Sequence, residues 1–249
     1  MLSQIVRNTG TIAAVDAVAG VERSRVSDQV FRILSQDVLG GRYPPGELMP
    51  TQRRLAADLG VNMASVREAV KRLEQLRLVE SRQGEGMRVR DWRSDAGLDV
   101  LAHLVVGPGG LDARTLSAVL EARRLMLGEA ARLAAVRRTE EQADVLVDLA
   151  HRIAAAGSVE DVQPLDFAFF YELVQTAGNV VFALITNSIR EVYLENAAAF
   201  RPLLEDHGSL AHYYRRGALA VRSGDPARAA GAVRRLAETQ ERRLLEALR

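Results

Sequence analysis

The chain has 249 residues, of which 48% are hydrophobic, and it carries a formal net charge of +1. This length fits two domains of ordinary size, and this apolar content excludes a globally disordered chain. The absence of cysteine excludes disulfides and thiolate metal sites, and no apolar run is long enough for a membrane span or a signal peptide, so we expect a cytoplasmic protein.

Positive charge is concentrated in one part of the chain. Residues 25–93 contain 13 Lys and Arg against 9 Asp and Glu, whereas residues 94–249 contain 18 against 21. A local surplus of cations is typical of a surface that meets phosphates, although ordinary variation in solvated charge gives similar counts. The motifs within residues 25–93 must therefore decide what the surplus means.

The chain begins with an extension and a helix. Residues 1–24 show no clear hydrophobic period, and no function is assigned to them. Apolar residues then recur three and four positions apart from Val26 to Leu39, which predicts a helix. Gly40 and Gly41 end this helix, and the Pro-Pro-Gly run at 44–46 predicts an extended turn.

Two short helical patterns separated by a turn come next. The first is predicted from Thr51 to Leu59 and ends at Gly60, which supplies a left-handed conformation. Asn62 is a favourable N-cap for the second. The outward residues of the second helix are expected to be Met63, Ala64, Ser65, Arg67, Glu68 and Lys71. In a helix-turn-helix, the start of the second helix meets base edges and phosphates, so this pattern predicts a DNA-recognition helix.

A predicted β-hairpin completes this unit. Its strands are expected at residues 78–81 and 87–90, with a glycine-rich turn at 82–86 between them. Glycine lets the backbone approach a groove closely, and Arg82 and Gln83 at the tip can donate hydrogen bonds to DNA. Together the elements predict a winged helix-turn-helix; a small domain whose hairpin binds a protein is the alternative.

The remainder of the chain is predicted to be helical. Residues 93–110 read as a linker with one short helix at 98–106, which a Gly-Pro-Gly-Gly run ends. Further helices are expected at 111–135, 139–156, 158–176, 180–199, 207–222 and from 225 to the C-terminus. The predicted fold is therefore mainly α, with a winged helix-turn-helix at 25–92 and an all-α bundle at 111–249.

These motifs resemble the GntR-type bacterial transcription regulators. The matching stretches in the first unit are PPG at 44–46, P-x-x-R-x-L-A from Pro50, LGV at 59–61, VREAV with KRL at 66–73, and the G-x-G of the wing. The helical half resembles the FadR branch through Trp92, EARR at 121–124, LDFAFF from Leu165, AGN at 177–179 and SGDP at 223–226. The resemblance covers about residues 26–245.

The resemblance implies a homodimer that binds a palindromic operator in double-stranded DNA and responds to a small effector bound in the helical domain. The residues that this plan places on DNA are Arg53, Asn62, Ala64, Ser65, Arg67, Lys71, Gln83 and Gly84. One position departs from the family pattern, since Met63 stands where relatives commonly carry an arginine that reads guanine. Its absence costs about 1–3 kcal/mol of base discrimination for a lost bidentate contact.

The effector is expected to be an organic anion, and no metal or cofactor is expected. Many relatives bind a metal through an aspartate and three histidines, but here Asp166 is accompanied by Phe170, Tyr214 and Leu236. One carboxylate without imidazoles makes a poor transition-metal site. The loss of all three histidines resembles the fatty acyl-CoA-responsive FadR branch.

Two kinds of effector stay open at this point. Aromatic residues are expected to line a pocket for an acyl chain, or else to form a plain core. Arg123 could instead hold another carboxylate ligand, or pair with Asp166 or Glu121. The residues expected at the ligand are Arg123, Asp166, Phe170, Tyr171, Phe200 and Tyr214.

The competing functions are an enzyme on the helical bundle and a ligand-binding or scaffold protein that has lost DNA specificity. An enzyme needs a metal, a cysteine or a Ser/His/Asp constellation, and the four histidines lie in unrelated contexts. Only Met63 favours lost DNA specificity. A DNA-binding transcription regulator, not an enzyme, is therefore predicted.

Overall fold

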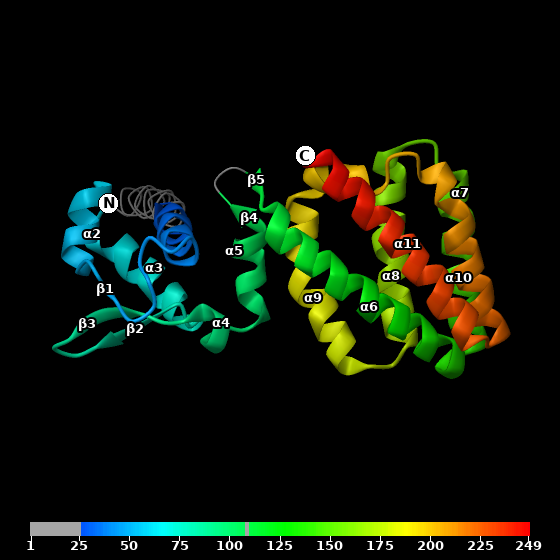
Figure 1. The fold of residues 1–249 in the computed structure, drawn as a ribbon, viewed down its shortest axis with the longest axis horizontal. Coiled ribbons are helices and arrows are strands. Elements are labelled where there is room, and N and C mark those ends of the chain that lie inside the picture. The colour runs from blue at the N-terminus through cyan, green and yellow to red at the C-terminus, as the bar shows by residue number, and fades with distance from the viewer. Residues whose placement is uncertain (1–25, 108–109) are drawn as a thin grey trace, which may run out of the picture. The chain divides into compact units, whose positions relative to one another are not determined.

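The computed structural model describes residues 26–107 and 110–249, and the predicted extension at 1–24 lies outside these residues. The chain divides into one compact unit that ends at Pro108 and a second that begins at Gly109 (Figure 1). No helix in the described part of the chain is both long and apolar enough to cross a membrane.

The first unit is a winged helix-turn-helix. Residues 26–39 are helical, as predicted. They are followed by β1 (Leu48–Met49), α2 (Gln52–Leu59), α3 (Met63–Gln75), β2 (Val79–Arg82) and β3 (Gly86–Val89). The sheet is antiparallel in the order β1-β3-β2, so the hairpin gains a third strand that the sequence pattern did not predict. β1 is only two residues long, too short for a period of two to be visible.

Capping and burial explain the helix-turn-helix. Thr51 caps α2, and Gly60 ends it with φ of 64°, as predicted. Asn62 caps α3 by accepting a hydrogen bond from the Ser65 amide (2.9 Å). The two helices and the helix at 26–39 enclose one apolar core with the sheet, formed by Val30, Phe31, Leu34, Val38, Leu55, Val66, Ala69, Val70, Leu73, Leu78, Val79, Met87 and Val89.

The connecting segment differs in detail from the prediction of one helix at 98–106. It contains α4 (Trp92–Asp95), the 3-10 turn η1 (Leu98–Val100) and α5 (Leu101–Val105). Two short strands follow, β4 (Val106–Gly107) at the end of the first unit and β5 (Gly110–Leu111) at the start of the second. Asp91 caps α4 with its side chain, which explains the additional turn of helix at Trp92.

The second unit is a helical bundle, as predicted. Its elements are α6 (Ala113–Arg137), α7 (Glu140–Ala155), α8 (Val159–Thr176), α9 (Val180–Glu195), η2 (Ala197–Leu203), η3 (His207–Ser209), α10 (Ala211–Ser223) and α11 (Pro226–Ala247). The capping box at Thr139 and the Asp225-Pro226 start of α11 are both present. The helix predicted to run to 199 instead ends at Glu195 and gives way to η2, which contains Pro202.

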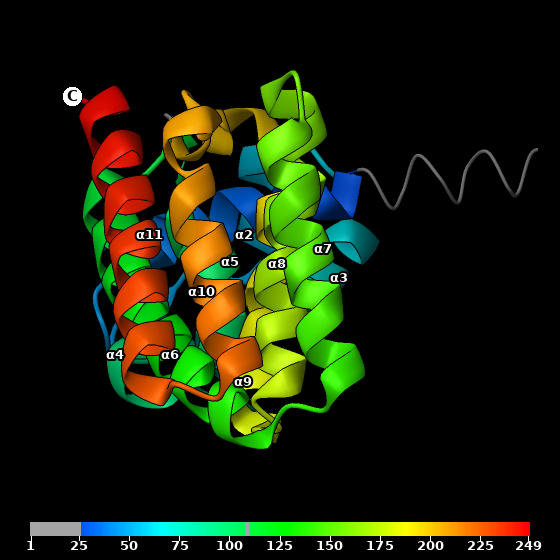
Figure 2. The ribbon, with the colours of Figure 1, turned by 90° about the vertical axis from the view of Figure 1, so that its right-hand side faces the viewer.

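The bundle helices follow one another around a common core. α6, α11, α10, α7 and α8 each pack on the next, and α8 returns to α6, while α9 packs against α8 and η2. Figure 2 shows α11, α10 and α7 side by side at the front. Small residues allow α6 and α11 to approach closely; these are Gly128, Ala130, Ala131, Ala134, Ala229, Ala230 and Ala237.

Gly60 supports a direct test of the turn between α2 and α3. Gly60→Ala should lower the free energy of unfolding by about 1–2 kcal/mol, because an L side chain is strained at positive φ. Gly157→Ala is the matched control, since Gly157 has ordinary φ and open space around its Cα. Urea unfolding followed by circular dichroism measures both, and equal midpoints for the two variants would contradict the strain.

Candidate functional site

One exposed face of α3 carries the residues predicted to meet DNA. Ala64, Arg67 and Lys71 lie three and four positions apart and are all exposed, so they form one stripe along the helix. The first turn of α3 contains no acidic residue, so its free amides and positive dipole end remain unneutralised. This combination favours phosphate binding at the start of the helix. Asn62 is exposed beside it, although its side-chain oxygen is engaged in the cap.

The basic residues of the first unit fall into two groups, those that form ion pairs and those that do not. Arg54 pairs with Asp58 and Arg72 pairs with Asp28, so both are tied to neighbouring acids. Among the residues that the structure describes, Arg53, Arg67 and Lys71 form no ion pair. The predicted DNA contacts are therefore cations whose charge is not already offset within the protein.

The wing has the geometry of an exposed hairpin tip. Gln83 and Gly84 are exposed between β2 and β3, and Gly84 has φ of 82°. Arg82 is held back by Glu80 and Glu85 at 3.3 and 3.7 Å. Gln83 is therefore the donor at the tip that is free to enter a groove.

Two residues expected to face outward on α3 do not. Ser65 is buried, with 2% exposure, and its hydroxyl has no hydrogen-bond partner among the described residues. Met63 is partly buried and packs against the apolar core. Ser65 shares a face with Ala69 and Leu73, four and eight positions on, so helical spacing accounts for its burial. The prediction that Ser65 faces outward is wrong.

A buried polar cluster joins four helices of the bundle. Asp166 on α8 is 3% exposed and accepts hydrogen bonds from the Tyr214 hydroxyl on α10 and from the Gln240 amide on α11, the latter at 2.8 Å. The Gln240 amide also lies 3.0 Å from the Tyr214 oxygen. Arg123 on α6 donates to the Gln240 carbonyl oxygen at 3.1 Å. Asp166, Tyr214 and Arg123 were predicted to lie together, whereas Gln240 was missed.

Arg123 is held on two sides but keeps free donors. Its guanidinium lies 4.6 Å from the centre of the Phe170 ring, which supports a cation–π contact. Gln240 is its hydrogen-bond partner in the described part of the chain. A guanidinium has five N–H groups, so most of them remain available to an anion. Of the two pairings left open for Arg123, the one with Glu121 is not formed between these described residues, and Asp166 interacts with Arg123 through charge and not through a direct hydrogen bond.

A chain of aromatic rings lies beside this cluster. Phe167 stacks with Tyr171 and Tyr193 at 6.2 and 5.8 Å between ring centres, and Tyr193 contacts Phe200 at 5.3 Å. The Tyr193 hydroxyl is buried and makes no hydrogen bond of ordinary geometry with a described residue. Gln163 lies nearby, but its amide donates to a backbone carbonyl at 2.7 Å. Tyr193 is one of the aromatic residues that the sequence predicts for a pocket or a plain core, but its buried hydroxyl was not singled out, because one tyrosine in an aromatic helix has no distinctive spacing.

Burial shifts the acid–base properties of the cluster. Loss of solvent raises the pKa of Asp166, and the positive charge of Arg123 with the hydrogen bonds from Tyr214 and Gln240 opposes that rise. Burial, followed by the charge of Asp166, raises the pKa of Tyr214 and of Tyr193. Arg123 therefore stabilises the negative charge of this interior.

The residues at the family's metal positions form a hydrogen-bonded cluster here. Tyr214 occupies one histidine position and donates to Asp166, while Phe170 and Leu236 are apolar and buried. Within the described ranges, no three His, Asp or Glu side chains are grouped as metal ligands. The prediction that no metal is needed stays a prediction.

The comparisons with known proteins identify the family. Residues 26–89 match the family described as bacterial regulatory proteins, gntR family, and residues 118–239 match the FCD domain. The HTH-type transcriptional regulator Mce2R of Mycobacterium tuberculosis is 38% identical over 93% of this chain and 97% of its own length. The uncharacterized HTH-type transcriptional regulator Rv0494 of the same species is 30% identical over 92% of this chain and 93% of its own length. The chain therefore belongs to the gntR family and is a transcription regulator with an FCD domain, not an enzyme.

More distant likenesses agree with the fold. The solved structure of Lar, described as controlling expression of the Listeria monocytogenes agr system, aligns with a TM-score of 0.50 over 88% of this chain and 94% of its own, at 14% identity. The fatty acid metabolism regulator protein of Proteus mirabilis is 23% identical over 64% of this chain and 65% of its own length. The structure of Lar thus shares the fold of this chain.

Replacement of Asp166 should expose the cost of its buried charge. Because its folded-state pKa is raised, the folded protein holds this proton more tightly than the unfolded chain does. The free energy of unfolding should therefore fall as pH rises from the ordinary value of 3.8 towards the raised value. Asp166→Asn retains an oxygen acceptor and removes that dependence. Denaturation of both proteins across this range measures the difference, with the exposed Asp144→Asn as control; identical pH slopes for wild type and Asp166→Asn would be the contrary result.

Proposed function

We propose that this regulator binds a two-fold symmetric operator as a homodimer, with the exposed stripe of α3 in the major groove and the wing tip beside it. The unpaired cations Arg53, Arg67 and Lys71 carry this proposal, because each is exposed at the helix-turn-helix. Gln83 and Gly84 supply the wing contact. Two copies read two half-sites, which is how a helix-turn-helix dimer obtains specificity.

Base recognition differs from the arrangement common in the family. Met63 packs on the core and offers no donor, and Ser65 is buried, so neither reads a base edge. Arg67 is the first long polar side chain on the outer face of α3. Arg67 therefore makes the direct base contact in this proposal, while Lys71, Arg53 and the amides at the start of α3 position the helix on phosphates.

The salt dependence of DNA binding tests this interface. Arg67→Ala should weaken binding to a duplex recovered by in vitro selection by about 1–3 kcal/mol for each half-site and relax its base preference. Lys71→Ala should weaken binding to all sequences and reduce the salt slope by about 0.9 for each half-site, or about 1.8 for the dimer. Fluorescence anisotropy across salt concentrations measures both. Arg190→Ala, on the exposed side of α9, is the control; unchanged binding by Arg67→Ala would remove α3 from the interface.

We further propose that the effector is an organic anion, a fatty acyl-CoA or another carboxylate, held in the bundle by Arg123. The open donors of Arg123 and the Tyr193 hydroxyl, which makes no hydrogen bond of ordinary geometry with a described residue, support an anion in this position, because both can donate to one carboxylate. Phe170, Tyr171 and Phe200 provide apolar surface for the rest of the ligand. The likeness to fatty acid metabolism regulator proteins supports the acyl-CoA form.

A thermal-shift panel separates these two ligand classes. The panel contains long-chain acyl-CoAs, the matching free fatty acids, small dicarboxylates and sugar acids. A ligand at 100 times its Kd should stabilise the folded protein by about 2.7 kcal/mol and raise the midpoint. Arg123→Gln should abolish the shift, whereas Arg132→Gln on the same helix should retain it, since Arg132 is exposed and paired with Glu129. A shift that survives Arg123→Gln would place the effector elsewhere.

A further inference from the structure

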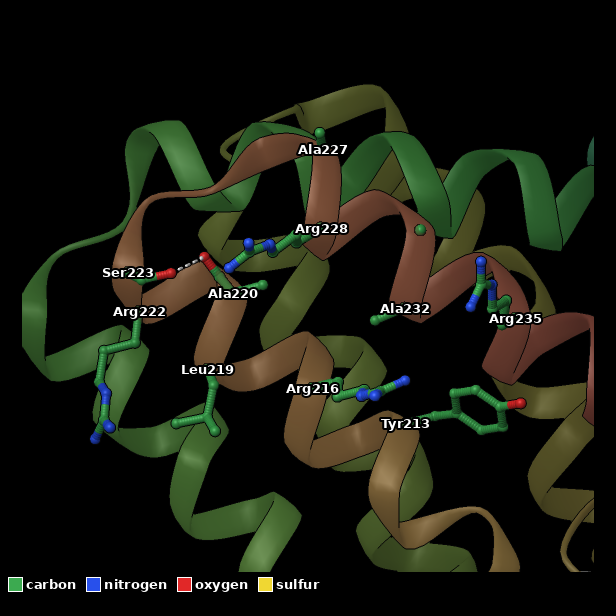
Figure 3. Close-up of a pocket in the computed structure, with 11 residues that line it drawn as sticks. Tyr213, Arg216, Leu219, Ala220, Arg222, Ser223, Ala227, Arg228, Ala232 and Arg235 are labelled. Carbon is green, nitrogen blue, oxygen red and sulfur yellow. Dashed lines mark hydrogen bonds between the residues drawn. The ribbon is translucent and has the colours of Figure 1, made fainter.

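A groove lined by arginines runs between α10 and α11 on the outside of the bundle. Its volume is about 1010 Å³, and Figure 3 shows Arg216, Arg228 and Arg235 along it with Tyr213. The apolar and small residues that line it, which together we call its floor, are Leu219, Ala220, Ala227, Gly231 and Ala232. The groove therefore presents an apolar bottom between cationic rims.

Most of this positive charge is not offset nearby. Arg228 pairs with Asp225 at 3.3 Å. In the described part of the chain, Arg216 and Arg235 form no ion pair, and both are exposed. An exposed arginine is well solvated alone, but two of them on opposite rims of one groove raise the local positive potential. This surface matches a partner that brings carboxylates on both sides of an apolar residue.

The neighbouring helix α7 carries such a pattern on its outer side. Val145 is 46% exposed, although it is a large apolar residue. Three exposed acidic residues surround Val145 on the helix. Glu141 lies four positions before it, Asp144 one position before it and Asp148 three positions after it. Of these, Asp148 pairs with Arg152 at 3.7 Å, and both partners are solvent-exposed. The outer face of α7 is thus an apolar residue with an acidic rim.

The groove and the acidic face lie at the same level of the bundle. α7 and α10 are antiparallel, because His207 before α10 contacts the Ala156 carbonyl at the end of α7 (3.0 Å). At the opposite end, Arg138 before α7 donates to the Arg222 carbonyl near the end of α10 (3.2 Å). Val145 in the first half of α7 is therefore level with the second half of α10, where the groove floor lies.

We propose that the groove of one copy receives the α7 face of a second copy, so that the two bundles form a symmetric dimer. α10 separates the groove from α7, and the three helices lie side by side (Figure 2). A two-fold axis parallel to α10 leaves the position of each residue along that axis unchanged. It places the groove side of one copy opposite the α7 side of the other. Each groove then faces the partner's α7, and the contact is made twice.

The chemistry of the two faces is complementary throughout this contact. Val145 enters the floor of small residues, which excludes water at the centre. The acidic rim of α7 meets Arg216, Arg228 and Arg235, which gives the apolar centre and charged rim that specific interfaces show. This inference rests on the proposed dimeric regulator, since it names the surface through which the helical domains pair.

Charge reversal in the full chain provides the test. Arg216→Glu with Arg235→Glu should raise the dimer dissociation constant at least about tenfold, because each change acts twice across the two-fold axis. Asp144→Lys with Asp148→Lys should do the same. The variant that carries all four substitutions again places opposite charges across the interface. Its dimer dissociation constant should return to within about threefold of the wild-type value. Sedimentation velocity over a range of concentrations measures each value, and circular dichroism verifies that each variant is folded.

The controls distinguish failure of this interface from failure of the proposed function. Arg190→Glu, on the exposed side of α9, should leave the dissociation constant unchanged. Normal dimers from either reversed pair, or monomers from Arg190→Glu, would overturn the interface while the dimeric regulator stands. Binding of inorganic pyrophosphate in the groove without dissociation of the dimer would also overturn the interface alone. A wild-type chain that binds its DNA as a monomer would overturn both.

Discussion

The carboxylate of Asp166 is the constraint on which the helical bundle depends. It is buried at the meeting point of α6, α8, α10 and α11, where Tyr214 and Gln240 donate to it and Arg123 supplies positive charge. A buried charge is tolerated only while its partners remain in place. A movement of any of these helices that separates the partners is therefore penalised. A ligand that engages Arg123 acts on the interaction that sets the helix positions, which gives the proposed effector a physical route to the rest of the domain.

The winged helix-turn-helix could be predicted almost completely from the sequence, because its signals are local. Gly60 and Asn62 mark the turn through their own backbone and capping preferences, and the period of the apolar residues marks the buried face of each helix. The same holds for the capping box at Thr139 and for Asp225 before Pro226. β1 could not be predicted, since a two-residue strand is formed by its partner β3 and not by its own pattern.

The candidate site could be predicted only in part, because its missing members depend on contacts distant in sequence. Gln240 lies 74 positions from Asp166, and nothing around it marks it as a polar residue in a core. Tyr193 acquires its meaning from the neighbouring rings and from the absence of a described partner for its hydroxyl. Ser65 shows the opposite error: it was assigned to the outward residues of α3, although its spacing from Ala69 and Leu73 indicated burial.

A net charge of +1 conceals separate electrostatic patterns in the two units of this chain. In the first unit, Arg54 and Arg72 are paired with neighbouring acids, whereas Arg53, Arg67 and Lys71 form no ion pair with a described residue and remain open to phosphates. In the second, the arginine groove and the acidic face of α7 carry opposite charge on either side of α10. An unpaired cation on a helix surface has little significance alone, because water solvates it well. It becomes informative when its neighbours on the same face are also unpaired and when a surface of opposite charge exists to meet them, and both conditions hold for the groove.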